Sequence, residues 1–124
     1  MPTLSESQEA KNLATYLDAL VAYKQIVCYT KTYQEAFAKG SGWGLIQKRK
    51  AEGVRHGLPD YIICTHKALI FIELKKQKGA KGGLNGSKIA PEQLLWIETL
   101  NRLGVPATIA HGADEAIDFI KKHI

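Results

Sequence analysis

Cysteine is scarce in this chain of 124 residues, which has only Cys28 and Cys64. Two cysteines are too few for a disulfide scaffold, and both lie in apolar runs, so we expect buried thiols in a reducing compartment. The sequence contains no C-x-x-C motif and no Cys/His cluster of the kind that binds zinc. A secreted disulfide-rich domain and a zinc-binding module are therefore excluded.

Long apolar runs are also missing. No run approaches the roughly 18 residues that a membrane span requires. The first residues lack the basic and apolar blocks of a signal peptide. We therefore expect a soluble protein of the cytoplasm, folded as a single domain over residues 1–124.

Acidic residues are fewer than basic ones. Asp and Glu number 12 and Lys and Arg number 17, which gives a net charge of +5. A basic surface favours a polyanionic partner, and nucleic acid is the first candidate, although an unspecialised basic surface explains the charge equally well. Residues 75–88 contain five lysines and four glycines but no acid, so we expect a mobile basic loop there.

The periodicity of apolar residues predicts an α/β fold. Helical spacing covers residues 5–22, 45–52, 91–103 and the segment after Gly112, and part of 34–39 can also be helical. Strand patterns cover residues 25–30, 60–65, 68–75 and 106–110. The order α-β-(α)-β-β-α-β-α predicts a central mixed β-sheet with helices on both faces.

Two acidic residues fall at one end of the clearest predicted hairpin. If the chain reverses at His66–Lys67, Asp60 lies directly opposite Glu73, about 5 Å away, where like charges repel. A divalent cation between the two carboxylates would explain this placement. Strand alternation puts Lys75 on the same face as Glu73. The structural alternative is a plain Glu–Lys ion pair at the end of a strand.

Polar residues at the starts of two predicted helices are further candidates. Gln93 shares a face with the apolar residues Trp96, Ile97 and Leu100, and its amide either reaches the acids or only satisfies the helix end. Glu6 and Glu9 lie on nearly one face at the start of the first helix. First-turn acids are favoured by the helix dipole, so a structural role and a role in the site are both open.

The acid pair belongs to a longer pattern that resembles a known family. Pro59-Asp60, twelve further residues and Glu73-Leu74-Lys75 resemble the motif of the PD-(D/E)xK nuclease superfamily. The fuller pattern resembles the VRR-NUC (virus-type replication-repair nuclease) family in three segments: Gly53-Val54-Arg55-x-Gly57-x-Pro59-Asp60, Phe71-Ile72-Glu73-Leu74-Lys75 and Pro91-Glu92-Gln93-x-x-Trp96. The similarity covers nearly the whole chain and implies a stand-alone member of phage or bacterial type, with a restriction-endonuclease-like core.

The resemblance implies a role for each matching residue. Asp60 and Glu73 would bind a metal together with the backbone carbonyl of Leu74, and Lys75 would orient the attacking water. Gln93 matches the family's helix glutamine. For the glutamate of the N-terminal helix, Glu6 is the first choice and Glu9 the alternative. The chain departs from the family at Ala90, where a hydroxyl residue is usual, and over residues 31–44, which follow no pattern that we can assign.

The implied activity is hydrolysis of phosphodiester bonds in DNA, in replication, recombination or repair. Hard oxygen ligands suit Mg²⁺, with Mn²⁺ able to substitute. The basic residues expected to follow the DNA backbone are Lys48, Arg49, Arg55, Lys76, Lys78, Lys81 and Lys88. The size and plan resemble Holliday-junction resolvases, which implies a homodimer on a four-way junction. A nuclease for flaps, nicks or single-stranded ends, or a non-catalytic DNA-binding module of the same fold, remains an alternative.

Overall fold

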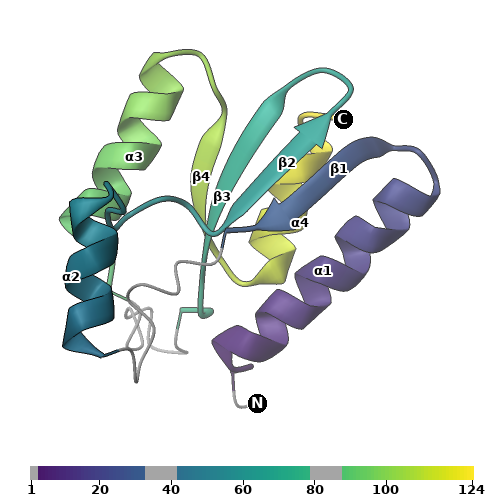
Figure 1. The fold of residues 1–124 in the computed structure, drawn as a ribbon. Coiled ribbons are helices and arrows are strands. Elements are labelled where there is room, and N and C mark those ends of the chain that lie inside the picture. Colours follow the sequence, from purple (N-terminus) through teal and green to yellow (C-terminus); the bar gives the residue numbers. More distant parts are fainter. Residues whose placement is uncertain (1–2, 33–41, 79–87) are drawn as a thin grey trace.

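The computed structural model describes residues 3–32, 42–78 and 88–124. Its elements, in chain order, are α1 (Glu6–Ala22), β1 (Ile26–Lys31), α2 (Trp43–Ala51), β2 (Tyr61–Thr65), β3 (Leu69–Lys75), α3 (Pro91–Arg102), β4 (Ala107–His111) and α4 (Ala113–Lys121) (Figure 1). This order confirms the predicted one. The helix suggested around 34–39 and most of the predicted basic loop, including Lys81, lie outside the described residues.

The four strands form one mixed sheet, as predicted. They lie in the order β1-β2-β3-β4. β1, β2 and β3 are antiparallel to their neighbours, whereas β4 runs parallel to β3. A parallel neighbour needs a crossover connection, and α3 lies within the segment that supplies it.

Helices cover both faces of the sheet, so the central strand β3 is buried on both sides. Ile70, Ile72 and Leu74 belong to the larger core, which also contains residues of α1 and α4. The alternate residue Phe71 belongs to a smaller core with Ile97 of α3. Figure 1 shows α1 and α4 together beside the sheet and α3 apart from them, next to β4. The site candidates Glu73 and Lys75 lie on the same face of β3 as Phe71.

The first helix forms because of its cap and its apolar stripe. The Ser5 hydroxyl accepts a hydrogen bond from the backbone N–H of Gln8 at 3.1 Å, which satisfies one of the free donors at a helix start. Leu13 and Leu17 are 0% exposed, and burying each side chain contributes roughly 1.5–3 kcal/mol. Val21, four residues after Leu17 at the end of the helix, is 36% exposed.

Two predictions of burial are wrong. Cys28 is exposed and Cys64 is half-buried. They face each other across β1 and β2, while α3 packs against β4 at the opposite edge and leaves this part of the sheet uncovered. Trp96 was expected on the core face of α3 but is 40% exposed. It precedes Ile97 and is rotated about 100° around the helix from it, which brings it to the margin of that face.

Among the described residues, no helix combines the length and the apolar character needed to cross a membrane.

Candidate active site

The hairpin register brings the two predicted acids to one place. Tyr61 pairs with Ile72, so the preceding residue Asp60 lies opposite Glu73, as the sequence predicted. The Asp60 Oδ2 atom accepts a hydrogen bond from the backbone N–H of Leu74 at 3.0 Å. Glu73 is only 3% exposed. The peptide of Leu74 therefore lies against the acid pair, although its side chain is part of the larger core.

The environment of the pair disfavours two negative charges. Burial, the neighbouring Asp60 carboxylate and a hydrogen bond to it raise the pKa of Glu73 to about 8, against the opposing effect of Lys75. Burial is also the main cause that raises the pKa of Asp60, while the hydrogen bond from Leu74 and the cations Lys31 and Lys75 lower it. The pair thus holds a proton at neutral pH unless another positive charge replaces it.

Two side chains hold Glu73 in position. The Lys75 Nζ atom lies 3.6 Å from Glu73 Oε2. The Gln93 amide Nε2 donates a hydrogen bond to the same oxygen at 3.0 Å. The other end of that amide, Oε1, accepts from the backbone N–H of Ala90 at 3.0 Å. Gln93 therefore satisfies the backbone N–H of Ala90 at the helix start and also reaches the acid, whereas Ala90 offers no side-chain acceptor to the N–H groups of the first turn.

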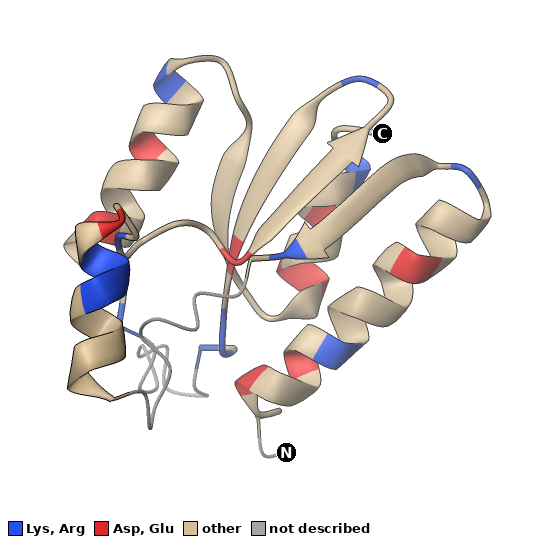
Figure 2. Ribbon diagram, viewed as in Figure 1, with Lys and Arg blue, Asp and Glu red and all other residues tan. Residues whose placement is uncertain are grey.

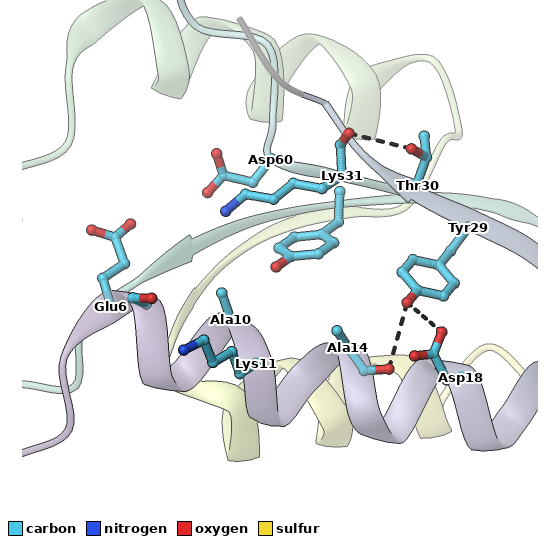
Figure 3. Close-up of a pocket in the computed structure, with 11 residues that line it drawn as sticks. Glu6, Ala10, Lys11, Ala14, Asp18, Tyr29, Thr30, Lys31 and Asp60 are labelled. Atoms are coloured by element: carbon cyan, nitrogen blue, oxygen red, sulfur yellow. Dashed lines mark hydrogen bonds between the residues drawn. The ribbon is translucent and has the colours of Figure 1, made fainter. Parts of the chain in front are cut away.

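A cleft with several charged side chains in its walls opens beside Asp60 at the end of the sheet. It has a volume of about 850 Å³ and its walls come from α1, β1 and the start of β2. Figure 3 shows Glu6, in the first turn of α1, with its carboxylate on the side of Asp60 and Lys31. Burial, and after it the charges of Asp60 and Glu6, raise the pKa of Tyr61 to about 12. Glu6 and Asp60 therefore line the same cleft, Glu6 from α1 and Asp60 from the residue before β2.

Glu9 takes a different position. Its side chain is 2% exposed and its Oε1 atom accepts a hydrogen bond from the backbone N–H of Ala113 at 3.3 Å, at the start of α4. Gly112 has a φ of +99°, and a Cβ there would lie 2.9 Å from Glu9 Oε2 and 2.8 Å from Gln77 Cγ. Gly112 thus lets the carboxylate approach the helix start. The structure brings Glu6 to the cleft of Asp60 and Glu9 to α4.

Lys31 is a residue of the site that the sequence analysis missed. It ends β1 opposite Tyr61, its Nζ atom lies 5.9 Å from the centre of the Tyr61 ring, and its charge lowers the pKa of Asp60. In Figure 3 its ammonium group points towards Asp60. Its position at the end of β1 could have indicated this role, because the end of a strand antiparallel to β2 lies beside the residue that precedes β2, which is Asp60.

The donor set fits a hard divalent cation. Asp60 and Glu73 offer carboxylate oxygens, the Leu74 carbonyl is next to them in the chain, and Glu6 faces the adjoining cleft. No three His, Cys, Asp or Glu residues among those described stand close enough to hold a metal by themselves. A cation here would therefore rely on the two carboxylates, backbone oxygen and water, which is the usual manner of Mg²⁺.

The basic candidates that the structure describes lie on three segments of the chain. Lys48 and Arg49 lie on α2, none of whose residues is fully buried, and Arg55 lies in the connection from α2 to β2. Lys76 and Lys78 directly follow β3, and Lys88 precedes α3. Figure 2 shows acidic residues where β2 and β3 come together and a band of basic residues on α2.

A family model named VRR-NUC domain matches residues 5–114. The chain belongs to the VRR-NUC family. The matched segment begins at the cap of α1 and contains Glu6, Asp60, Glu73, Lys75 and Gln93. A VRR-NUC domain is a nuclease-type domain that processes DNA.

The fold of this VRR-NUC domain is also found in a solved structure. The match to a chain described as a VRR_NUC domain protein has a TM-score of 0.70 at 24% identity, and it covers 100% of this chain and 91% of the other. This similarity shows the α/β fold. A search of curated proteins found no match.

Proposed function

We propose that this VRR-NUC domain is a Mg²⁺-dependent endonuclease that hydrolyses phosphodiester bonds in DNA, with Mn²⁺ as a substitute. The observation that supports this most strongly is the pairing of half-buried Asp60 with buried Glu73. Burial is the main cause that raises the pKa of both carboxyls, so a cation beside them would be favoured. A purely structural Glu–Lys pair would not need a second carboxylate opposite Glu73.

The side chains of the site have separable tasks. Asp60 and Glu73 would hold the cation, and Glu6 would approach it from the cleft. Gln93 fixes one oxygen of Glu73 at 3.0 Å and so restricts the carboxylate to one orientation. Lys75, which is 9% exposed, would orient the attacking water and offset the charge that develops on the phosphate oxygens. When bound, the metal lowers the pKa of its water and stabilises negative charge on the phosphate.

The basic residues around the site suit the DNA backbone. Contacts between lysine or arginine and phosphate carry no sequence information, so we propose structure-selective rather than sequence-specific cutting. A single active site on a chain of this size suits a homodimer that cuts a four-way junction symmetrically. The Holliday-junction resolvase activity rests on this reasoning and on the VRR-NUC resemblance. The second candidate is a nuclease for flaps, nicks or single-stranded ends.

One cleavage panel tests the enzyme. Wild-type protein, Glu73→Gln and the matched control Glu98→Gln, at an exposed position of α3, are incubated with duplex, flap, single-stranded and four-way-junction DNA in Mg²⁺, Mn²⁺ or EDTA. We expect metal-dependent cutting by wild type and Glu98→Gln and none by Glu73→Gln. Absence of cutting by wild type on every substrate, with DNA still bound, would instead indicate a non-catalytic binding module.

The same panel tests the resolvase. Symmetric cutting of the junction, together with a dimer by light scattering, is the expected result. A monomer that cuts flaps or single-stranded ends but not junctions would assign the second candidate.

A further inference from the structure

A second, more apolar cleft lies beside the site on α3. It has a volume of about 420 Å³ and is lined by Arg55, His56, Glu92, Leu95, Trp96 and Thr99. Trp96 is 40% exposed and Leu95 is 64% exposed, so a tryptophan and a leucine form an accessible apolar surface. Neither residue belongs to the core clusters. The folding of the domain therefore does not account for a large aromatic ring at this position.

Both walls of the cleft continue into the candidate active site. Gly57 has a φ of +103°, and a Cβ there would lie 2.7 Å from the backbone carbon of Glu92, so the loop packs tightly against the first turn of α3. Three residues further along the chain this loop reaches Asp60. On the other wall, Gln93 contacts Glu73, and Trp96 follows one helical turn later, about 5–6 Å away between Cβ atoms.

Cations border the apolar surface. The Arg55 Nη1 atom donates hydrogen bonds to the carbonyls of Lys50 at 2.7 Å and of Val54 at 3.0 Å, which hold the guanidinium in place. A neighbouring hollow of about 410 Å³ shares Arg55, His56 and Glu92 and adds Lys50 and Val54. An aromatic surface next to a guanidinium held in place complements a nucleotide, because the base stacks on the ring and the phosphate pairs with the charge. The single carboxylate, Glu92, can accept hydrogen bonds from amino groups of a base.

We propose that this cleft binds an unpaired nucleobase of the DNA substrate, stacked on Trp96, while the adjoining phosphate lies against Arg55. The inference rests on the proposed function and narrows its substrate. A base inside a duplex has both faces covered by its neighbours, so only an unpaired or flipped base can enter. DNA with unpaired nucleotides next to the cut, such as a flap or a frayed branch point, should therefore be preferred over continuous duplex.

Trp96 itself supplies the readout. The chain has two tryptophans, Trp43 and Trp96, so Trp43→Phe leaves Trp96 as the sole indole fluorophore. This variant is titrated in EDTA with a duplex, a flap, a single strand and an abasic single strand of equal length, and binding is followed separately by the anisotropy of labelled DNA. We expect the single strand and the flap to quench Trp96 several-fold more strongly than the duplex or the abasic strand.

Affinity provides the second measurement. Trp96→Ala should bind single-stranded DNA about tenfold more weakly, as expected for loss of one base–aromatic stack, and Trp96→Phe should retain most of the affinity. Leu103→Ala, at a residue that is 71% exposed just after α3, is the matched control and should bind like wild type. Thermal denaturation of each variant shows whether it is folded.

Several results would overturn the proposal. Equal quenching of Trp96 fluorescence by duplex or abasic DNA would mean that the cleft contacts only the sugar-phosphate backbone and not a base. A change in Trp96 fluorescence that depends on protein concentration without DNA would assign the cleft to contact with a second copy of the chain. DNA binding without any response of Trp96 would defeat this inference alone, whereas absence of DNA binding would defeat the proposed function with it.

Discussion

Glu73→Gln should stabilise the metal-free protein at alkaline pH, although it removes a charged group that contacts Lys75 and Gln93. The pKa of Glu73 is raised from 4.5 to about 8 in the folded protein. Below pH 4.5 the carboxyl is protonated in the folded and the unfolded states, so its contribution to stability is fully present there. As the pH rises to about 8, the unfolded chain releases the proton first and the free energy of unfolding falls.

The size of the effect follows from the shift. Each unit of pKa corresponds to about 1.4 kcal/mol. The difference between 4.5 and about 8 therefore sets an upper limit of roughly 5 kcal/mol, which Asp60 shares because the two carboxyls are coupled. Glutamine keeps the shape of Glu73 and carries no charge at any of these pH values, so it avoids the loss.

The assay is urea denaturation in EDTA at about pH 5.5 and about pH 8.5, pH values on either side of most of the transition. We expect Glu73→Gln to gain several kcal/mol in the free energy of unfolding relative to wild type when the pH is raised from the lower to the higher value. In urea this corresponds to a relative shift of the midpoint by at least about 1 M. Glu98→Gln controls for the loss of one negative charge. Mg²⁺ at the higher pH should stabilise wild type but not Glu73→Gln. Parallel behaviour of the two proteins over this range would refute the assigned pKa shift.

Other variants test the remaining parts of the site. Glu6→Gln should lower the rate of cleavage by at least about tenfold without changing the thermal midpoint. Glu9→Ala should instead lower the free energy of unfolding by about 1–3 kcal/mol, because the buried N–H of Ala113 loses its acceptor. The reverse pattern would assign Glu9 to the chemistry. Lys31→Ala should move the acidic limb of the pH–rate profile to higher pH, because it removes a cation that lowers the pKa of Asp60. Lys31→Arg, which keeps the positive charge, should return the limb to its wild-type position. An acidic limb that does not move in Lys31→Ala would contradict the interaction between Lys31 and Asp60. Gly57→Ala should lower the free energy of unfolding in urea by about 1–3 kcal/mol, because Gly57 has a positive φ and the backbone of Glu92 lies close to it. Gly44→Ala, with open space around the added methyl group, is the control. Equal stability of the two variants would show that residue 57 imposes no strain on alanine.

Much of the acid site could be predicted because it depends on local regularities. The alternation of strand residues and a short reversal at His66–Lys67 determine which residues lie opposite each other, and Tyr61 does pair with Ile72. The helical spacing of Gln93 and Ile97 likewise predicted the face that reaches Glu73. These relations involve neighbouring elements and need no knowledge of the whole fold.

What the sequence left open or missed depends on contacts between distant segments. Glu6 and Glu9 are three residues apart on one helix, and the first points to the cleft while the second meets α4, more than a hundred positions later. No property of the first helix alone distinguishes them. The exposure of Cys28 depends on α3 covering β4 rather than β1, and the role of Lys31 depends on how β1 pairs with β2.

The acids of the site lie on elements that differ in how readily they unfold locally, and the cap at Ser5 protects the weaker one. Glu73 belongs to the well-buried strand β3 and Asp60 is hydrogen-bonded to it, whereas Glu6 is the first residue of α1, where helices open most readily. The hydrogen bonds from the Gln8 N–H to Ser5 Oγ and from the Glu9 N–H to the Ser5 carbonyl stabilise the turn that carries Glu6. Opening of this one turn would withdraw a carboxylate while leaving the sheet intact. Hydrogen exchange at Gln8 would thus report how often Glu6 is in place for the proposed metal site, separately from whether the protein is folded.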